Sequence, residues 1–353
     1  MSALCQQPII IAGPCSVESR AQLHAVVKGL SEIPQITMIR CGIWKPRTHP
    51  GGFEGHGEEA LVWIDELKQH YPTLRFCCEV AQPAHVETVL RHAIDAVWIG
   101  ARTTGNPFSV ESLAQVLQGS GLPVLVKNAP TPDVEPWIGA IERLLSAGIK
   151  DVIAVHRGFT TYNHGNLRNT PLWEIPIELR RRMPDLPILC DPSHIAGRRD
   201  RVSLLASMAT DMGFDGLMIE THPSPNEAWT DAAQQITPNE LQQLLSHLLV
   251  RIDDAETAEL LLHDHRSQID EVDEQLLGLL QQRMHISREI AKTKTQHQIS
   301  IVQIQRWEHL LTARMKSAQD MGLNAQFIKE IFEKIHAESI RVQTHENERA
   351  HSL

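Results

Sequence analysis

Eight short apolar segments cross the first two thirds of the chain, and nearly all of them end on or beside a charged or metal-binding side chain. The segments are rich in Ile, Val and Cys and do not alternate with polar residues, as is typical of parallel strands buried on both faces. Segments with helical periodicity separate them, for example residues 19–30, 58–70 and 136–147. This order predicts an α/β fold, a right-handed (β/α)8 or TIM barrel over residues 1–250. The apolar segments comprise residues 9–13, 37–44, 75–80, 96–100, 123–128, 151–155, 187–190 and 216–219.

An open, doubly wound sheet is the alternative topology for alternating strands and helices. Such a sheet often carries a GxGxxG motif after a strand and binds its ligand at a single switch point. No GxGxxG follows a strand in this sequence, and the chemical groups gather at eight strand ends instead of one point. The barrel is therefore the preferred interpretation.

The composition changes from residue 255 onward, where proline is absent and only Gly278 and Gly322 interrupt a helical pattern. Apolar residues recur there at steps of three, four and seven, which predicts one stripe along a helix of about 40 residues. Further helices are expected over residues 303–318 and 324–343. We therefore expect a linker at 251–258, an all-helical domain at 259–345 and a polar tail at 346–353. The stripe consists of Leu262, Ile269, Val272, Leu276, Leu279, Leu280, Ile286 and Ile290.

Charge and composition restrict the class of protein. Acidic residues outnumber basic ones by 43 to 33, for a net charge of -10, which argues against nucleic acid or an anionic membrane as the main partner. No apolar run reaches the roughly 18 residues of a membrane helix, and no basic region precedes the first apolar segment. The six cysteines show no CxxC spacing. We expect a cytoplasmic protein with reduced thiols that acts on small molecules.

Four potential metal ligands lie at or beyond the ends of the predicted strands. A thiolate, an imidazole and two carboxylates suit one divalent ion such as Mn, Fe, Co or Zn, with Mn favoured, whereas Mg and Ca prefer oxygen ligands. Each residue taken alone would more often be a core or solvated side chain. Because the C-terminal strand ends of a barrel share one rim, we expect the four to converge. They are Cys15, His194, Glu220 and Asp231.

Six cations lie in or just after four of the predicted strands. In an acidic protein, converging cations indicate polyanionic substrates. Arginine offers a planar fork and lysine a point charge, so the set suits two phosphorylated compounds, one of which also carries a carboxylate. A metal ion beside cations that bind phosphate groups indicates that the enzyme catalyses addition to a carbonyl group. The cations are Arg40, Lys45, Arg47, Arg102, Lys127 and Arg157.

Five short motifs give the barrel a resemblance to a known family. They are Ala12-Gly13-Pro14-Cys15-Ser16, Lys45-Pro46-Arg47-Thr48, Gly100-Ala101-Arg102-Thr103-Thr104, Asp191-Pro192-Ser193-His194 and Glu220-Thr221-His222-Pro223. Together they closely resemble type I 3-deoxy-D-arabino-heptulosonate 7-phosphate (DAHP) synthase, which condenses phosphoenolpyruvate with erythrose 4-phosphate at the start of the shikimate pathway. The Lys-Pro-Arg-Thr motif discriminates, because the related barrel that makes 3-deoxy-octulosonate 8-phosphate lacks it.

The resemblance implies a role for each of these residues. It assigns the metal to Cys15, His194, Glu220 and Asp231. The residues expected to hold phosphoenolpyruvate are Arg40, Lys45, Ala101, Arg102, Lys127 and Arg157. Those expected to hold erythrose 4-phosphate are Lys45, Pro46, Arg47 and Thr48.

The hypothesised reaction is an aldol-like condensation. The metal polarises the aldehyde of erythrose 4-phosphate while the enol carbon of phosphoenolpyruvate attacks it, and water then adds as phosphate leaves. Glu79, with Lys45 or His156, is expected to handle protons. An orienting role for Glu79 is the open alternative.

Arg266, Arg283, Lys294 and Arg306 lie in the helical tail, where most other charges have neighbours of opposite sign. The charge pattern alone therefore predicts that these four side chains are solvated. The tail nevertheless contains Leu262-x-x-x-Arg266-x-x-Ile269-Asp270-x-x-Asp273-x-x-Leu276-Leu277-x-Leu279-Leu280-x-x-Arg283, followed by Lys294, Arg306, Ser339 and Gln343. This pattern resembles the all-helical chorismate mutase family, an intertwined dimer that rearranges chorismate to prephenate. By this resemblance the cations grip the two carboxylates, Lys294 and Gln343 meet the ether oxygen, and Arg266 reaches the site of the other chain. Preorganised donors and conformational restriction would suffice without a nucleophile or base. The residues implied to bind chorismate are Arg266, Arg283, Lys294, Arg306, Ser339 and Gln343.

Two positions depart from the pattern of that family. Gln303 and Trp307 stand where the family often carries acidic residues, the second of which binds the chorismate hydroxyl. Three explanations stay open. The geometry of the mutase site is altered, Glu308 takes the place of the missing acidic residue, or the domain binds chorismate but has weak mutase activity.

Two functions are compatible with the tail. The chain is a bifunctional enzyme, or a DAHP synthase whose tail is mainly a dimerisation module that senses prephenate or chorismate, and the two interpretations are compatible with each other. A purely structural tail is the third interpretation, and its four cations count against it. We expect no N-terminal regulatory domain, because Cys15 lies close to residue 1. We therefore expect prephenate to inhibit the synthase through the tail.

Overall fold

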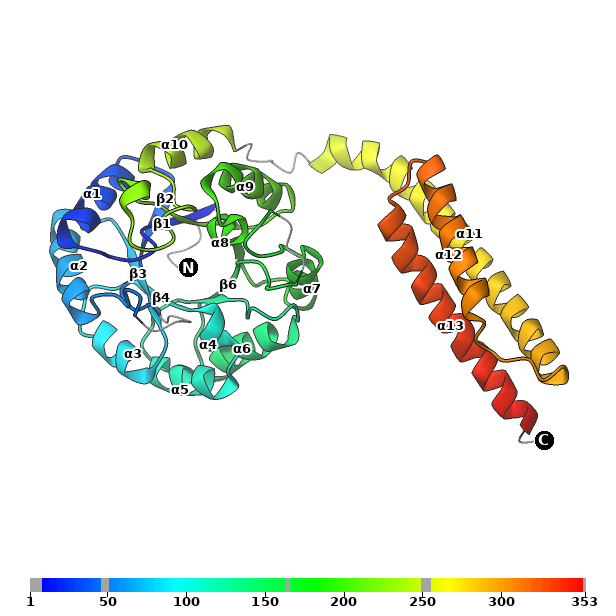
Figure 1. Ribbon diagram of the computed structural model, residues 1–353. Coiled ribbons are helices and arrows are strands. Elements are labelled where there is room, and N and C mark those ends of the chain that lie inside the picture. The colour runs from blue at the N-terminus through cyan, green and yellow to red at the C-terminus, as the bar shows by residue number, and fades with distance from the viewer. Residues whose placement is uncertain (1–7, 46–50, 163–165, 249–254, 352–353) are drawn as a thin grey trace. The chain divides into compact units, whose positions relative to one another are not determined.

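The computed structural model describes residues 8–45, 51–162, 166–248 and 255–351. The chain divides into two compact units, Met1–Arg251 and Ile252–Leu353. The first is a closed barrel of strands and helices and the second is a set of three helices (Figure 1). The predicted fold class is thereby confirmed. None of the described helices combines the length and apolar character required to cross a membrane.

The barrel consists of eight parallel strands in sequence order. Each strand pairs with the next, and the last pairs with the first, so the described sheet has no open edge. All eight C-terminal ends therefore meet at one rim. The strands are β1 (Ile9–Gly13), β2 (Ile36–Cys41), β3 (Phe76–Val80), β4 (Ala96–Ile99), β5 (Val124–Lys127), β6 (Val152–His156), β7 (Ile188–Cys190) and β8 (Gly216–Glu220).

Helices surround the strands, and several begin with a clear cap (Figure 1). Thr237 and Glu240 form a capping box on α10, and the Ser19 hydroxyl accepts from the backbone of Gln22 at the start of α1. The helices of this unit are α1 (Arg20–Ser31), α2 (Glu58–His70), α3 (Pro83–Val89), α4 (Ala101–Thr104), α5 (Pro107–Leu117), α6 (Glu135–Ser146), α7 (Glu174–Arg182), α8 (Pro192–Ala196), α9 (Val202–Asp211) and α10 (Pro238–His247), with short 3-10 turns η1 (Arg199–Arg201) and η2 (Pro225–Glu227).

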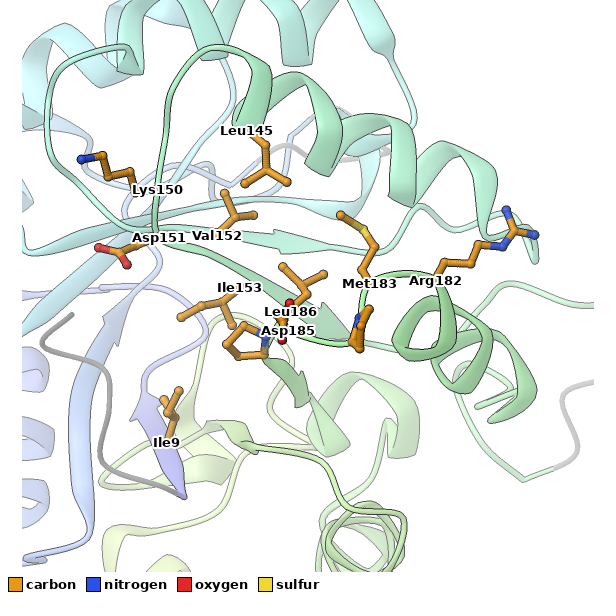
Figure 2. A pocket seen from close by; sticks show the side chains of 12 residues that line it. Ile9, Leu145, Lys150, Asp151, Val152, Ile153, Arg182, Met183, Asp185 and Leu186 are labelled. Atoms are coloured by element: carbon orange, nitrogen blue, oxygen red, sulfur yellow. The ribbon is translucent and has the colours of Figure 1, made fainter. Parts of the chain in front are cut away.

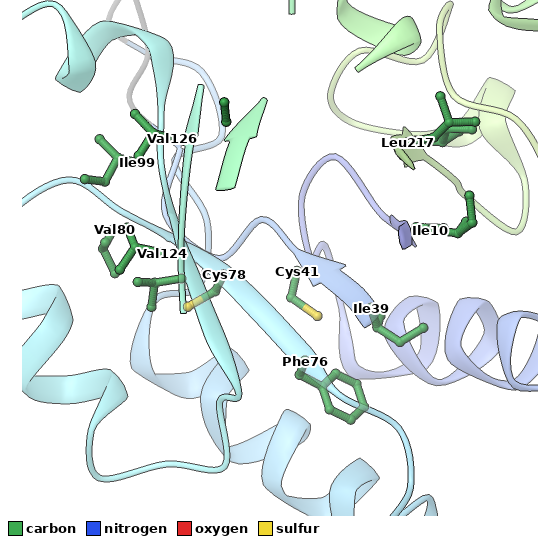
Figure 3. Close-up of a cluster of buried hydrophobic side chains, with 14 of the residues drawn as sticks. Ile10, Ile39, Cys41, Phe76, Cys78, Val80, Ile99, Val124, Val126 and Leu217 are labelled. Carbon is green, nitrogen blue, oxygen red and sulfur yellow. The ribbon is translucent and has the colours of Figure 1, made fainter. Parts of the chain in front are cut away.

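Alternation along the strands divides the core into two layers. In β1, Ile9 and Ile11 belong to the cluster that fills the barrel, whereas Ile10 belongs to the larger cluster between strands and helices. Figure 3 shows part of this outer layer, including Cys41 and Phe76. Both layers are almost fully shielded from water, which explains the continuous apolar runs of the sequence.

One glycine brings two site-bearing loops together. A Cβ atom on Gly42 would lie 1.9 Å from the backbone oxygen of Cys15. Only glycine therefore lets the segment after β2 approach the segment after β1 this closely. The approach places Lys45 beside Cys15.

The second unit is formed by α11 (Ala255–Gln296), α12 (Ile304–Asp320) and α13 (Ala325–His351), and α13 packs against both other helices. At 42 residues, α11 is close to the predicted length, and α13 continues into the segment that the sequence analysis treats as a polar tail. Most of the predicted apolar stripe is exposed in a single chain: Ile269 is 59% and Leu279 61% accessible. The three helices thus leave a long apolar face uncovered within this unit.

Candidate functional site

A cavity of about 950 Å³ opens at the C-terminal rim of the barrel. Residues at the ends of seven strands, β2 to β8, or in the segments that follow them line it, so the strand ends converge as the topology requires. The lining comprises Lys45, Gly51, Gly52, Phe53, Glu79, Gly100, Ala101, Arg102, Lys127, Pro130, Arg157, Thr160, Arg168, Asn169, His194, Trp229, Thr230 and Asp231.

Another cavity, of about 490 Å³, lies at the opposite end of the barrel. Ile9 and Val152, at the starts of their strands, border it together with Leu186 (Figure 2). The N-terminal face of such a barrel serves stability and rarely carries catalytic groups. The predicted metal ligands and substrate-binding cations of this chain lie at the other end.

The four predicted metal ligands lie close together at the C-terminal rim. Potential ligand atoms of Cys15, Glu220 and Asp231 all lie within 4.8 Å of one another, and the Cys15 sulfur is 3.3 Å from Asp231 Oδ2. His194 Nε2 lies 3.7 Å from Glu220 Oε1. Cys15 and Glu220 are completely buried. Soft, imidazole and carboxylate donors around one small space fit a divalent transition-metal ion.

Neighbouring polar groups hold these ligands in place. Gln234 Nε2 donates to Glu220 Oε2 at 2.6 Å, and Arg168 donates to Asp231 Oδ1 at 2.9 Å. The His194 side chain contacts Asp191 Oδ2 through Nδ1 at 2.7 Å, which leaves Nε2 turned toward Glu220. Such outer contacts fix the orientation of metal ligands.

The thiol of Cys15 depends on a nearby cation for ionisation. Burial, followed by the negative charge of Glu220, raises its pKa to about 12. Lys45 opposes this shift, since its Nζ lies 3.2 Å from the sulfur. A bound metal ion would favour the thiolate much more strongly.

Two cations lie deep in the barrel over one indole ring. The guanidinium of Arg40 is 5.1 Å and the ammonium of Lys127 5.9 Å from the centre of the Trp98 ring. Arg40 is 1% exposed and pairs with Glu220 at 3.0 Å, but its Nε and Nη1 find no hydrogen-bond acceptor among the described residues. Lys127 pairs with Asp191 at 2.7 Å. These buried donors can bind an anion that enters from the cavity.

Two further arginines line the cavity directly. Arg157 donates to Asn169 at 3.0 Å, and burial lowers its pKa to about 10. Arg102 lies in α4, whose first residue is Ala101. The structure therefore brings all the predicted phosphoenolpyruvate residues to the same rim. The other predicted phosphate ligands, Pro46, Arg47 and Thr48, lie outside the described residues.

Glu79 ends in the cavity as predicted. A Cβ atom on Gly100 would lie 2.1 Å from Glu79 Oε1, so only glycine at that position leaves room for this carboxylate. Burial lowers the pKa of Lys45, but the nearby Cys15, Glu220 and then Glu79 raise it, so the pKa lies above its usual value. Glu79 and Lys45 are thus electrostatically linked.

His156 does not reach the cavity, and its predicted catalytic role is not supported by its position. Val155 points into the barrel, so the next residue points outward. The imidazole is completely buried among aromatic rings, with centroids of Trp173 at 5.3 Å and Phe159 at 5.6 Å. Burial, followed by the charge of Arg157, lowers its pKa to about 3.

Several site residues escaped the sequence analysis. Arg168, Asn169 and Gln234 contact the predicted ligands or their partners, and Gln235 Oε1 accepts from the backbone of Cys15 at 3.0 Å. They lie in loops after β6 and β8. No strand-end position or periodic pattern marks such residues in a single sequence.

The helical unit brings four of its predicted residues to facing surfaces. Arg283 of α11 donates to Ser339 of α13, and Gln343 lies four residues further along α13. Lys294 donates to the Ile301 backbone oxygen at 2.6 Å. Ser339 and Gln343 are buried, and Gln343 Oε1 has no hydrogen-bond donor in the described part of the chain. Arg266 and Arg306 are exposed on α11 and α12.

Comparison with known proteins agrees with this division into two units. The model of the DAHP synthetase I family matches residues 5–254, and that of chorismate mutase type II matches residues 265–344. A phospho-2-dehydro-3-deoxyheptonate aldolase of Thermotoga maritima is 34% identical over 240 residues, which are 68% of either chain. A 2-dehydro-3-deoxyphosphooctonate aldolase of Desulfotalea psychrophila is 26% identical over 69% of this chain and 89% of its own.

Solved structures give the same result for the barrel. The crystal structure of the Thermotoga maritima DAHP synthase superposes with a TM-score of 0.61 at 31% identity, over 68% of this chain and 67% of that one. A truncated form of 3-deoxy-D-arabino-heptulosonate 7-phosphate synthase from the same organism gives 0.58 at 29% identity, over 67% and 84%.

Proposed function

We propose how two active sites work in a chain that belongs to the DAHP synthetase I family over residues 5–254 and carries a chorismate mutase type II domain over residues 265–344. Both domains are those of enzymes of aromatic biosynthesis, so the chain is a bifunctional enzyme. Its substrates are small molecules: phosphoenolpyruvate, erythrose 4-phosphate and chorismate. The roles of individual residues follow from the contacts described above.

Cys15, His194, Glu220 and Asp231 hold one divalent metal ion in this proposal, with Mn favoured. The distance of 3.3 Å between the Cys15 sulfur and Asp231 Oδ2 carries the assignment, because a thiol and a carboxylate from opposite ends of the barrel sequence meet at the cavity. When bound, the metal supplies a Lewis acid that polarises the aldehyde of erythrose 4-phosphate. Gln234 and Arg168 hold the carboxylates for this task.

Phosphoenolpyruvate binds to the cations of the same rim. Arg40 and Lys127 lie deepest and meet the carboxylate end, while Arg102 and Arg157 line the open cavity and suit the phosphate. Ala101 borders the same space. Lys45 lines the same cavity and contacts Cys15, and it also serves erythrose 4-phosphate, whose phosphate is assigned to Pro46, Arg47 and Thr48.

The condensation joins the enol carbon of phosphoenolpyruvate to the aldehyde carbon. The ammonium group of Lys45 lies 3.2 Å from the sulfur of Cys15. In this scheme it gives a proton to the aldehyde oxygen as the new carbon–carbon bond forms. Water then adds to the carbon that carries the phosphate group of phosphoenolpyruvate, and Glu79 takes a proton from this water. The phosphate then leaves that carbon. An orienting role for Glu79 toward Lys45 remains the alternative within this scheme.

Chorismate binds between α11 and α13. Arg283 and Arg306 bind its carboxylates, Ser339 hydrogen-bonds alongside Arg283, and Lys294 and Gln343 stabilise the negative charge that grows on the ether oxygen. The exposed stripe of α11 supports a homodimer through the helical unit, since so large an apolar face is normally covered by a partner. Arg266 of the second copy completes the site in this proposal.

Prephenate inhibits the synthase by binding the helical unit. Its two carboxylates fit the same cations as those of chorismate. The alternative is a tail that mainly binds prephenate or chorismate without useful turnover. Assays of both reactions on the full chain, with and without prephenate, separate these: a full chain without mutase turnover favours the alternative, and an unchanged synthase rate at saturating prephenate rejects the inhibition.

Loading with cobalt tests the metal site without relying on turnover. If the full chain binds Co²⁺ through Cys15, we expect a sulfur-to-metal charge-transfer band in its absorption spectrum, because a thiolate ligand of Co²⁺ produces such a band. The band should disappear in Cys15→Ser and persist in Cys190→Ser, since Cys190 is buried in the outer core layer. A band that survives Cys15→Ser would refute the assignment.

A further inference from the structure

The helical unit contains a stacked pair of rings that its assigned chorismate residues do not explain. Trp307 of α12 and His336 of α13 lie face to face, with centroids 3.9 Å apart and planes inclined by 6°. Both side chains are partly buried. The stack joins the two helices and fixes the orientation of the imidazole.

His336 extends the row of polar side chains that face α11. His336, Ser339 and Gln343 follow one another at steps of three and four, which places them on one face of α13. Ser339 accepts from Arg283, so this face is turned toward α11. Arg283 and Lys294 are eleven residues apart, about three turns, and thus share a face of α11. The imidazole lies at the start of the row that borders these two cations.

The surroundings of His336 keep its imidazole neutral near pH 7. Burial lowers its pKa, and the positive charges of Arg283 and Lys294 lower it further. A neutral imidazole has one donor and one acceptor nitrogen. His336 therefore adds to this face a hydrogen-bonding group without charge.

Chorismate has one polar group for which such a side chain is suited. Its two carboxylates require cations, and its ether oxygen gains negative charge during the rearrangement and requires a donor. The remaining ring hydroxyl is uncharged and both donates and accepts. We propose that His336 contacts chorismate directly, through a hydrogen bond between its imidazole and the ring hydroxyl, while Trp307 holds the imidazole in place. This inference rests on the proposed mutase site.

The test measures kcat/KM of the full chain for chorismate and for an analogue with hydrogen in place of the ring hydroxyl. His336→Phe keeps a ring to stack on Trp307 but removes both nitrogens. It should lose about tenfold on chorismate and nothing on the analogue. His336→Gln, which retains a donor and an acceptor, should lose less on chorismate than His336→Phe.

Two further variants complete the experiment. His345→Phe is the matched control, because His345 is exposed and lies nine residues along α13, on the opposite face; it should match the unchanged protein on both substrates. Lys294→Ala tests the proposed site itself and should lose most mutase activity. Full activity of His336→Phe on chorismate, or equal losses on both substrates, would overturn the role of His336. If Lys294→Ala also keeps full activity, the whole mutase site is misassigned.

Discussion

The ammonium group of Lys45 lies 3.2 Å from the sulfur of Cys15 and 2.9 Å from its backbone oxygen. This contact joins the proposed metal site to the proposed substrate cations. It also places a proton donor where the aldehyde of erythrose 4-phosphate would meet the metal. In the proposed mechanism Lys45 therefore takes part in both substrate binding and proton transfer.

Replacement of Lys45 by methionine is expected to lower kcat/KM of the synthase by at least about 10²-fold, because both proton transfer and charge stabilisation are lost. The mutase rate should not change. Steady-state assays of both reactions measure the two effects. Lys150→Met is the control, since Lys150 is exposed and borders the cavity at the other end of the barrel. Equal synthase rates in the two variants would contradict the role of Lys45.

Arg168 is expected to act through Asp231. Its guanidinium donates to Asp231 Oδ1 at 2.9 Å and to Gln234 at 2.7 Å. Arg168→Ala should weaken metal affinity by about 10- to 100-fold, as loss of an outer contact commonly does. Competition with a chromophoric chelator measures this affinity. Arg198→Ala, at an exposed arginine paired with Asp200, should leave it unchanged; a similar loss in both variants would point to a general charge effect.

His156 is expected to influence stability and not catalysis. Its pKa is about 3 in the folded protein against 6.5 for an ordinary histidine. Between these values the unfolded chain binds a proton that the folded chain does not. Stability is thus fully present above pH 6.5 and is lost as the pH falls, by up to about 1.4 kcal/mol per pH unit.

His156→Phe should remove this part of the pH dependence while leaving synthase kcat/KM within about twofold of its original value. Urea unfolding of the barrel transition at several pH values between 5 and 8 gives the stability difference. A large loss of synthase activity in this variant, with the fold intact, would show that the imidazole takes part in the reaction after all.

The barrel could be predicted because its strands obey a simple rule. Parallel strands buried on both faces have continuous apolar runs, and their C-terminal ends share a rim. That rule alone placed Cys15, Lys127 and Glu220 near one another, and the structure brings them to the same end. Motifs added the identity of the family, which no periodicity could provide.

The same rule failed for His156 because a strand end is not sufficient. Neighbouring residues of a strand point to opposite sides, so Val155 and His156 cannot both face the barrel interior. Choosing between them requires the register of β6. Arg168 and Gln234 were missed for a different reason, since long loops position side chains through tertiary contacts that a single sequence does not reveal.

In the helical unit, the sequence predicted the apolar stripe but not its environment. A stripe that repeats every three or four residues shows which side of a helix avoids water. It does not show which helix covers that side. Ile269 and Leu279 remain exposed in one chain, and the sequence pattern did not reveal that Trp307 stacks on His336.

The most direct test of the account is removal of metal from the full chain, followed by both assays on the same sample. After chelation and dialysis, condensation of phosphoenolpyruvate with erythrose 4-phosphate should fall by at least about 10²-fold and return when Mn²⁺ is added. Rearrangement of chorismate should continue unchanged, because the proposed mutase site uses only side-chain donors. Condensation that persists after metal removal has been verified would contradict the central claim that one metal-dependent and one metal-independent active site share this chain.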